Sequence, residues 1–300
     1  MVSALEQLRP SASIRQNARS FVDNIPVLMS RGIILSPDIM SDIATTLPSR
    51  PVTAIFPNRR AMGEAAARLV QDEIVRVVAA KDSARIIMAC APSQNDYYAA
   101  LIPLARATPE VWKKVHIFHM DDYAGLAADH EQSFRNYLRK HFLDHVEVAS
   151  FSPLRAEAAD IAAEARRYDA ALAAAPIDII SMGIGENGHI AFNDPPVADF
   201  NDPVRVKVVE LDPVCRQQQV NDGCFPTVAD VPKHALSLTL PVFANAGLLA
   251  CIVPTVRKAQ AVRDTLFAPV GAACPATLLR QHPRAHLFID ADAASLLPKR

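Results

Sequence analysis

From about residue 51 onward, short apolar runs alternate with longer amphipathic stretches. The apolar runs are rich in Val and Ile and have the length of strands that are buried on both faces. The amphipathic stretches repeat apolar residues at helical spacing. The clearest one, 58–79, places Met62, Ala66 and Ile74 on one side. This alternation predicts an α/β fold: a Rossmann-like, mostly parallel sheet with helices on both faces.

The same pattern gives the expected order of elements. We expect strands at 52–56, 85–90, 115–119, 177–182, 204–211, 235–240, 248–253 and 285–289, and helices at 58–79, 96–106, 133–142, 156–175, 255–266 and 291–297. No internal repeat or low-complexity linker interrupts them, so 51–300 is predicted to be one domain.

Residues 1–50 have a different pattern. Mixed helical signals there are broken repeatedly by proline, at Pro10, Pro26, Pro37 and Pro48. We interpret this segment as a helical N-terminal extension that packs on the domain or on a neighbouring subunit. A homo-oligomer is compatible with that interpretation.

Composition narrows the class of protein. Half of the 300 residues are hydrophobic, yet no uncharged apolar run reaches the roughly 18 residues of a membrane span. The first ten residues lack the basic-then-apolar plan of a signal peptide, so a cytoplasmic protein is expected. The formal net charge is −1 with both signs dispersed, which gives no support for a nucleic-acid or membrane partner. The five cysteines are widely spaced without a Cys-x-x-Cys pair, and we expect neither disulfides nor a metal site.

The most informative stretch is 177–195. It begins as a buried strand and continues into three of the chain's nine glycines, Gly183, Gly185 and Gly188. Glycine allows tight turns and a close approach of the backbone to a ligand. Four groups that can donate, accept or transfer protons follow: Asn187, His189, Asn193 and Asp194. Open α/β sheets bind ligands at such strand ends, so we expect the chemistry here.

Residues 183–195, Gly-Ile-Gly-Glu-Asn-Gly-His-Ile-Ala-Phe-Asn-Asp-Pro, resemble the signature of the glucosamine-6-phosphate deaminase/isomerase family. The related 6-phosphogluconolactonases share the glycine-rich core but usually lack the Ile-Ala-Phe-Asn-acid-Pro continuation. A lone glycine-rich loop is weak evidence, whereas thirteen ordered positions are specific. The resemblance covers about residues 51–297 and implies the Rossmann-like fold of that family.

A second motif follows the third predicted strand. The segment 118–125, Phe-His-Met-Asp-Asp-Tyr-Ala-Gly, resembles the family's Met-Asp-Glu-Tyr-x-Gly motif. The resemblance implies that Asp121 is the general base that moves a proton between C1 and C2, with Asp122 beside the substrate. Paired, partly buried acids can raise one pKa toward the working range. The alternative is that both residues only cap a turn.

The resemblance assigns opening of the sugar ring to Asn187, His189 and Asp194, with Gly185 and Gly188 contacting the substrate. His189 would carry the proton of the ring oxygen, and the other two would hold its orientation. Two positions depart from the common pattern: Asn187 replaces a frequent Asp, and Asp194 replaces the usual Glu and is shorter by one methylene. A purely structural histidine is the alternative.

The strongest departure lies after the second strand. Family members usually carry a glycine-rich Ser/Thr loop that grips the phosphate, whereas this chain has Ala-Cys-Ala-Pro-Ser-Gln-Asn-Asp at 89–96. Ser93 and Gln94 can still donate hydrogen bonds at a helix start. Arg205 and Lys258 resemble the family's phosphate-contacting cations, and solvated surface charges are the alternative. We expect these four residues to surround one anion site, with Asp96 turned away or neutralised by a basic neighbour.

The function implied is isomerisation and deamination of an amino-sugar phosphate: glucosamine 6-phosphate, or a close relative, gives fructose 6-phosphate and ammonia. Acid–base steps suffice for an enolamine intermediate, so no cofactor is expected. The expected partner is a small sugar phosphate. Two alternatives stay open, a lactonase of the sister family and a non-catalytic sugar-phosphate-binding protein.

Overall fold

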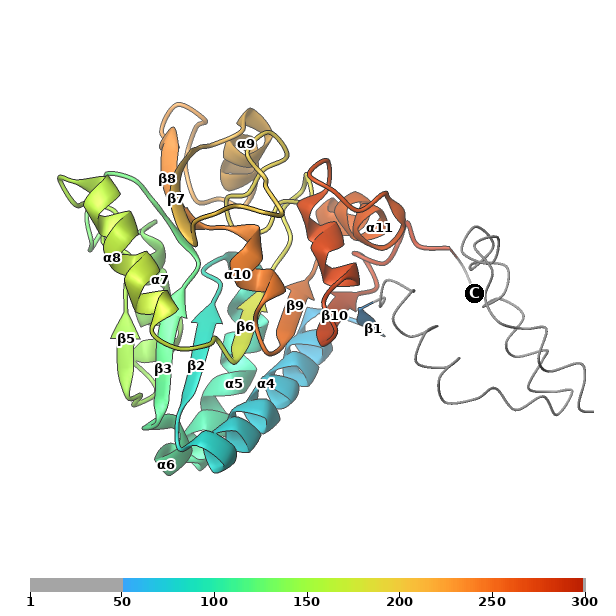
Figure 1. The fold of residues 1–300 in the computed structure, drawn as a ribbon. Helices are drawn as coiled ribbons and strands as arrows, with labels where there is room; N and C mark the ends of the chain where they lie inside the picture. The colour runs from blue at the N-terminus through green and yellow to red at the C-terminus, as the bar shows by residue number, and fades with distance from the viewer. Residues whose placement is uncertain (1–50, 299–300) are drawn as a thin grey trace, which may run out of the picture. The chain divides into compact units, whose positions relative to one another are not determined.

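The computed structural model describes residues 51–298, and the predicted extension over 1–50 lies outside them. A seven-stranded parallel sheet forms the centre of the fold (Figure 1), in the order β1-β10-β9-β6-β2-β3-β5. Its strands are β1 (Val52–Phe56), β2 (Ala84–Met88), β3 (Val115–His119), β5 (Ser150–Ser152), β6 (Ile179–Met182), β9 (Leu249–Val253) and β10 (Ala285–Asp290).

Successive side chains of the strands enter two separate cores. Ile86 of β2 packs in the core beneath α4 (Arg59–Lys81) and α5 (Asn95–Ala107), whereas Ile87 packs in the core on the opposite face. The second core includes residues of α8 (Ile161–Ala173), α10 (Leu240–Ala244) and α11 (Ala259–Phe267). Because both faces are covered, the strands read as continuous apolar runs.

Two local features position the N-terminal ends of helices α4 and α5. Asn58 caps α4 by accepting a hydrogen bond from the backbone N–H of Ala61 at 2.9 Å. Gly63 then lets α4 approach the start of α5 closely, since a Cβ at this position would lie 2.6 Å from the carbonyl carbon of Asp96. This contact holds the segment after β2 against the sheet edge where the candidate site lies.

A smaller antiparallel sheet adjoins the carboxyl ends of the parallel strands, and Figure 1 shows β7 and β8 beyond the arrowheads of β2 and β3. Its order is β4-β8-β7. The strands are β4 (Asp121–Tyr123), β7 (Val206–Glu210) and β8 (His234–Leu238), and α9 (Pro213–Asn221) follows β7. A core around Tyr123, Phe192 and Phe225 joins this layer to the loop after β6.

Further short elements complete the described chain: α6 (Pro109–Trp112), α7 (Phe134–Leu138), a π-helical turn (Arg139–Leu143), and the 3-10 turns η1 (Pro92–Gln94), η3 (Val256–Lys258) and η4 (Pro275–Arg280). Searched over these described residues, the chain has no helix long and apolar enough to cross a membrane.

The predicted α/β fold is confirmed, and every predicted strand overlaps an observed one. The predicted helix 291–297 is wrong. Residues 291–296 form turns instead, and Asp290 accepts hydrogen bonds at 2.8 Å from the backbone of Ala293 and at 3.1 Å from the backbone of Thr255. A side chain tied to both segments favours a compact turn over a further helix, and Pro298 follows closely.

Candidate active site

The loops that follow β9, β6, β2 and β3 meet at one edge of the sheet, where these four strands are neighbours. They enclose a cleft of about 900 Å³ including its open mouth. Residues of all four loops line it: Ser93, Gln94, Asp121, Gly185, His189 and Lys258. We expected Asp121, His189 and Asp194 to converge on one pocket at the strand ends. Asp121 and His189 line the cleft, and Asp194 contacts His189 at 2.8 Å without lining it.

Asp121 lies at the junction between the two sheets. It follows β3, begins β4, and is 6% exposed. Burial, and next the negative charge of Asp122, raise the pKa of Asp121 well above its ordinary range. A carboxylate with a raised pKa at a cleft wall can accept a proton from a carbon acid more readily than an ordinary aspartate.

Asp122 was predicted to contact the substrate but, unlike Asp121, it does not line the cleft. Its carboxylate accepts hydrogen bonds from the Ser133 hydroxyl at 3.1 Å and from the backbone N–H groups of Tyr123, Phe134 and Arg135 at 2.9–3.3 Å. Burial raises its pKa to about 6, with these four donors acting against the rise. Asp122 thus anchors the start of α7 and places a negative charge behind Asp121.

The loop after β6 holds His189 through two polar side chains. Nδ1 of His189 lies 2.8 Å from Oδ1 of Asp194. Asn187 donates from Nδ2 to the same oxygen at 2.9 Å, and its Oδ1 accepts from the backbone N–H of His189 at 3.0 Å. Burial by itself raises the pKa of Asp194, but the hydrogen bonds and charge of its neighbours, His189 first, hold it below its ordinary range. An ionised Asp194 therefore fixes Nδ1 of His189 as the protonated nitrogen and leaves Nε2 for substrate.

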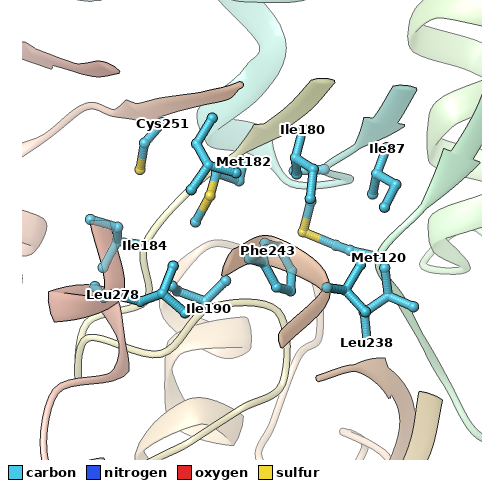
Figure 2. Packing of buried hydrophobic residues seen from close by; sticks show 14 of the residues in the cluster. Ile87, Met120, Ile180, Met182, Ile184, Ile190, Leu238, Phe243, Cys251 and Leu278 are labelled. Atoms are coloured by element: carbon cyan, nitrogen blue, oxygen red, sulfur yellow. The ribbon is translucent and has the colours of Figure 1, made fainter. Parts of the chain in front are cut away.

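Two glycines shape this loop. Gly185 makes room for the imidazole, since a Cβ there would lie 2.2 Å from Cε1 and Nε2 of His189. Gly188 adopts a φ of +81° and faces the Cys274 sulfur. Gly188 was predicted to contact the substrate but, unlike Gly185, it does not line the cleft. Ile184 and Ile190 anchor the loop from below by packing near Leu278 (Figure 2).

Gly185→Ala is expected to lower kcat/KM by about 100-fold, because the added methyl must displace the His189 ring by about 1 Å or more. Gly183→Ala is the matched control in the same loop, since its Cβ would meet Nε2 of Gln94 at an ordinary 3.4 Å. Steady-state kinetics and thermal melting of both variants check this. Equal losses in the two would show that steric access for His189 is not the cause.

The loops after β2 and β9 carry the anion-binding candidates that line the cleft. Ser93 and Gln94 lie in η1, and Gln94 donates from Nε2 to the Ser93 hydroxyl oxygen at 3.1 Å and to the Ile252 carbonyl at 3.3 Å. The Ser93 hydroxyl proton remains available to a ligand. Nε of Arg59 lies 2.9 Å from Oδ2 of Asp96, so the expectation that a basic neighbour neutralises Asp96 is confirmed.

Lys258 is a buried cation that lines the cleft. It lies in η3 after β9 and is 6% exposed. Burial lowers the pKa of Lys258, while the nearby carboxylates of Asp222 and Glu186 act in the opposite direction. An anionic group of a ligand would compensate the desolvated ammonium, which supports the prediction that Lys258 faces an anion.

Arg205 is not part of this site, and the prediction that it shares an anion site with Lys258 is wrong. It lies before β7, about half exposed, with Nη1 3.4 Å from Oδ2 of Asp169. It borders a different surface hollow with Leu172 and Pro241.

Among the cleft-lining residues that the sequence did not predict are the polar side chains of Arg59, Gln218 and Gln219. Arg59 follows β1 at a helix start, and its place after a parallel strand was a usable signal. The two glutamines lie in α9. Gln218 accepts a hydrogen bond from the backbone of Glu186 at 2.8 Å, and Gln219 accepts one from the Tyr123 hydroxyl at 2.7 Å.

His189, Asp194 and Cys215 present metal-ligand atom types within 4.8 Å of one another. The Asp194 oxygen that faces His189 already accepts a hydrogen bond from Asn187. We interpret the group as a hydrogen-bonded cluster and assign no metal to it.

Comparisons with known proteins agree with the motifs. Residues 57–288 match the family model of glucosamine-6-phosphate isomerases/6-phosphogluconolactonase. A glucosamine-6-phosphate deaminase of Pseudarthrobacter chlorophenolicus is 34% identical over 233 residues, which cover 77% of this chain and 88% of the relative. A Bacillus thuringiensis protein of the same name is 31% identical over 78% of this chain and 85% of its own.

Solved structures give the same result for the fold. A monomeric glucosamine-6-phosphate deaminase superimposes with a TM-score of 0.75 at 29% identity, covering 82% of this chain and 99% of its own. A 6-phosphogluconolactonase from Trypanosoma brucei has a TM-score of 0.66 at 19% identity over 83% of this chain and 100% of its own. At 19% identity, the similarity to the lactonase shows only that the two chains share a fold.

Proposed function

The chain belongs to the family of glucosamine-6-phosphate isomerases and 6-phosphogluconolactonases, and we propose that it converts glucosamine 6-phosphate and water into fructose 6-phosphate and ammonia. One observation carries this proposal. Asp121, a carboxyl group with a raised pKa, faces the same cleft as the His189–Asp194 pair. A base and a separately oriented imidazole are what ring opening followed by C1–C2 proton transfer requires.

In the proposed mechanism, Nε2 of His189 takes the proton of the C1 hydroxyl and returns it to the ring oxygen as the bond between C1 and the ring oxygen breaks, which opens the ring to the aldehyde. Asp194 stabilises the imidazole in the required orientation through Nδ1. Asp121 then removes the proton from C2 while the C1 oxygen takes up a proton from the ammonium group of the substrate, which gives an enolamine. The protonated Asp121 returns its proton to C1, which gives the protonated ketimine. Water adds to C2, the C–N bond breaks, and ammonia leaves with the proton that neutralises it. Every step is a proton transfer or an addition, so these side chains suffice.

The phosphate is proposed to lie at the end of the cleft formed by Ser93, Lys258 and Arg59, which line it together. Ser93 supplies a hydroxyl donor, Lys258 a buried ammonium, and Arg59 a guanidinium held by Asp96. These side-chain donors take the place of the glycine-rich backbone cradle. Weaker binding of glucosamine 6-phosphate than in glycine-loop relatives follows, because ordering side chains costs rotamer entropy. We further propose that the enzyme acts in the cytoplasm on this soluble substrate.

The test is an assay of the purified full-length protein with glucosamine 6-phosphate, unphosphorylated glucosamine and 6-phosphogluconolactone. Ammonia and fructose 6-phosphate should form in equal amounts from the first compound, and glucosamine should react with a much higher KM. Hydrolysis of the lactone without ammonia release from the amino sugar would refute the proposal.

Lys258→Met is expected to raise KM for glucosamine 6-phosphate by about 10–100-fold with little change in kcat, since a charge-assisted hydrogen bond contributes about 1.5–3 kcal/mol. Methionine preserves the length of the buried stem. Arg205→Met is the control, because Arg205 lies outside the cleft, and its KM should match the wild-type value. Calorimetric titration with glucosamine 6-phosphate and glucosamine checks the assignment. A Lys258 variant with unchanged affinity for the phosphorylated sugar would remove Lys258 from the site.

A further inference from the structure

Oδ2 of Asp194 is an unexplained polar atom in the site. Asp194 is fully buried, and both His189 and Asn187 use its other oxygen, Oδ1. Among residues 51–298, Oδ2 has no partner in strict hydrogen-bond geometry, and the backbone N–H of Asp212 is the one backbone donor near this carboxylate that lowers its pKa. A buried carboxylate oxygen without a donor is costly, and its charge is less well fixed.

The side chain next to this carboxylate is that of Cys215. It lies in the first turn of α9, is 1% exposed, and its Sγ lies within 4.8 Å of both the Asp194 carboxylate and a ring nitrogen of His189. Helix α9 is fixed there because Asp212 caps it by accepting from the backbone N–H of Val214 at 2.8 Å. Its N-terminal turn therefore holds the sulfur against the carboxylate.

Cys215 is protonated in this setting. Burial, followed by the neighbouring negative charges of Asp194 and Asp121, raises the pKa of the thiol well above its ordinary range. A hydrogen bond with the Gln219 side chain acts against this rise in the pKa of Cys215. A thiol that keeps its proton is a weak hydrogen-bond donor, and its S–H can rotate toward an acceptor.

We propose that Cys215 is a positioning residue that donates its S–H to Asp194 and thereby keeps the carboxylate in the orientation that contacts Nδ1 of His189. Asp194 then has a donor on each oxygen, so its charge and orientation are fixed before the substrate arrives. Cys215 touches no reacting atom and acts only through Asp194. The inference rests on the proposed function for its kinetic test, and on the structure alone for its spectroscopic test.

Three variants separate hydrogen bonding from packing. Cys215→Ser keeps a donor, Cys215→Val keeps an apolar group of similar volume, and Cys215→Ala removes both. We expect the serine variant to keep kcat within about 3-fold of wild type. The valine and alanine variants should each lose about 10-fold in kcat at unchanged KM for glucosamine 6-phosphate. If valine preserves kcat better than serine, the side chain acts by packing and the proposal fails.

A proton NMR measurement makes the test independent of turnover and of the substrate. The proton between Nδ1 of His189 and Asp194 is expected to give a downfield resonance, identified by its loss in His189→Gln. The chemical shift of this resonance should be unchanged in the serine variant and should change in the valine and alanine variants. Wild-type protein that releases no ammonia would refute the proposed function, while the resonance would still decide the role of Cys215. An unchanged chemical shift in the valine and alanine variants would overturn the proposed role of Cys215.

Discussion

Asp121→Asn is expected to lower kcat by about 10²–10⁴-fold while affinity for glucosamine 6-phosphate changes little, because the amide keeps the shape of the side chain and cannot accept the C2 proton. Ammonia release and calorimetric titration on the same preparation measure the two quantities. A variant that binds poorly but turns over its bound substrate at the wild-type rate would contradict the role of Asp121 as base.

The same substitution should stabilise the protein at neutral and higher pH. Folding raises the pKa of Asp121 above its ordinary 3.8, so the folded state holds this proton more tightly than the unfolded state. The cost of the buried charge is absent below the ordinary pKa, grows as pH rises toward the folded pKa, and is full above it. Thermal melting should therefore show a Tm gain for Asp121→Asn at pH 8 that shrinks as pH falls toward 4. A gain independent of pH would have another cause.

The wild-type enzyme should show the corresponding pH dependence. Asp121 must be ionised to act as base, so kcat/KM should fall as pH drops through its raised pKa. The acid limb should lie well above the ordinary carboxyl range. An acid limb near pH 4 would show that the pKa of Asp121 is not raised in solution.

Asp194→Asn is expected to cost about 10³–10⁴-fold in kcat, because asparagine cannot stabilise a charged imidazole or impose the tautomer with Nδ1 protonated. Asp194→Glu is the matched control. It keeps the charge in a fully buried position at a packing cost of about 1–3 kcal/mol, and should be at least 10-fold more active than the asparagine variant. Equal activity of the two would show that the charge at this position does not matter.

The sequence predicted six of the seven central strands because they are largely apolar, as in β6 and β9, but it missed β5, which is the short polar segment Ser150–Ser152. It did not reveal β4, since Asp121-Asp122-Tyr123 is a three-residue polar segment whose strand character arises only from pairing with β8. Helix α9 was also missed. Its start, Asp212-Pro213, is a good helix signal, but three consecutive glutamines, Gln217 to Gln219, obscure its periodicity.

The site was predictable where loops follow parallel strands. Ser93, Asp121, His189 and Lys258 all lie after such strands, and topology alone brings these ends together. Arg205 was misplaced because it precedes a strand of the antiparallel sheet, and local sequence contains no information on strand direction. Cys215 could not be found from sequence, because only the packing of α9 brings its thiol to Asp194.

The central claim is that Asp121 and His189 together convert an amino-sugar phosphate into a ketose phosphate. The most direct measurement follows glucosamine 6-phosphate labelled with ¹³C at C2 by NMR, with wild type and Asp121→Asn in parallel. With wild type, the C2 signal should move from that of an amine-bearing carbon to that of C2 of fructose 6-phosphate as ammonia appears. With folded Asp121→Asn, the C2 signal should remain that of the amine-bearing carbon. An unchanged C2 signal with wild type, or conversion at the wild-type rate by the variant, would contradict the account.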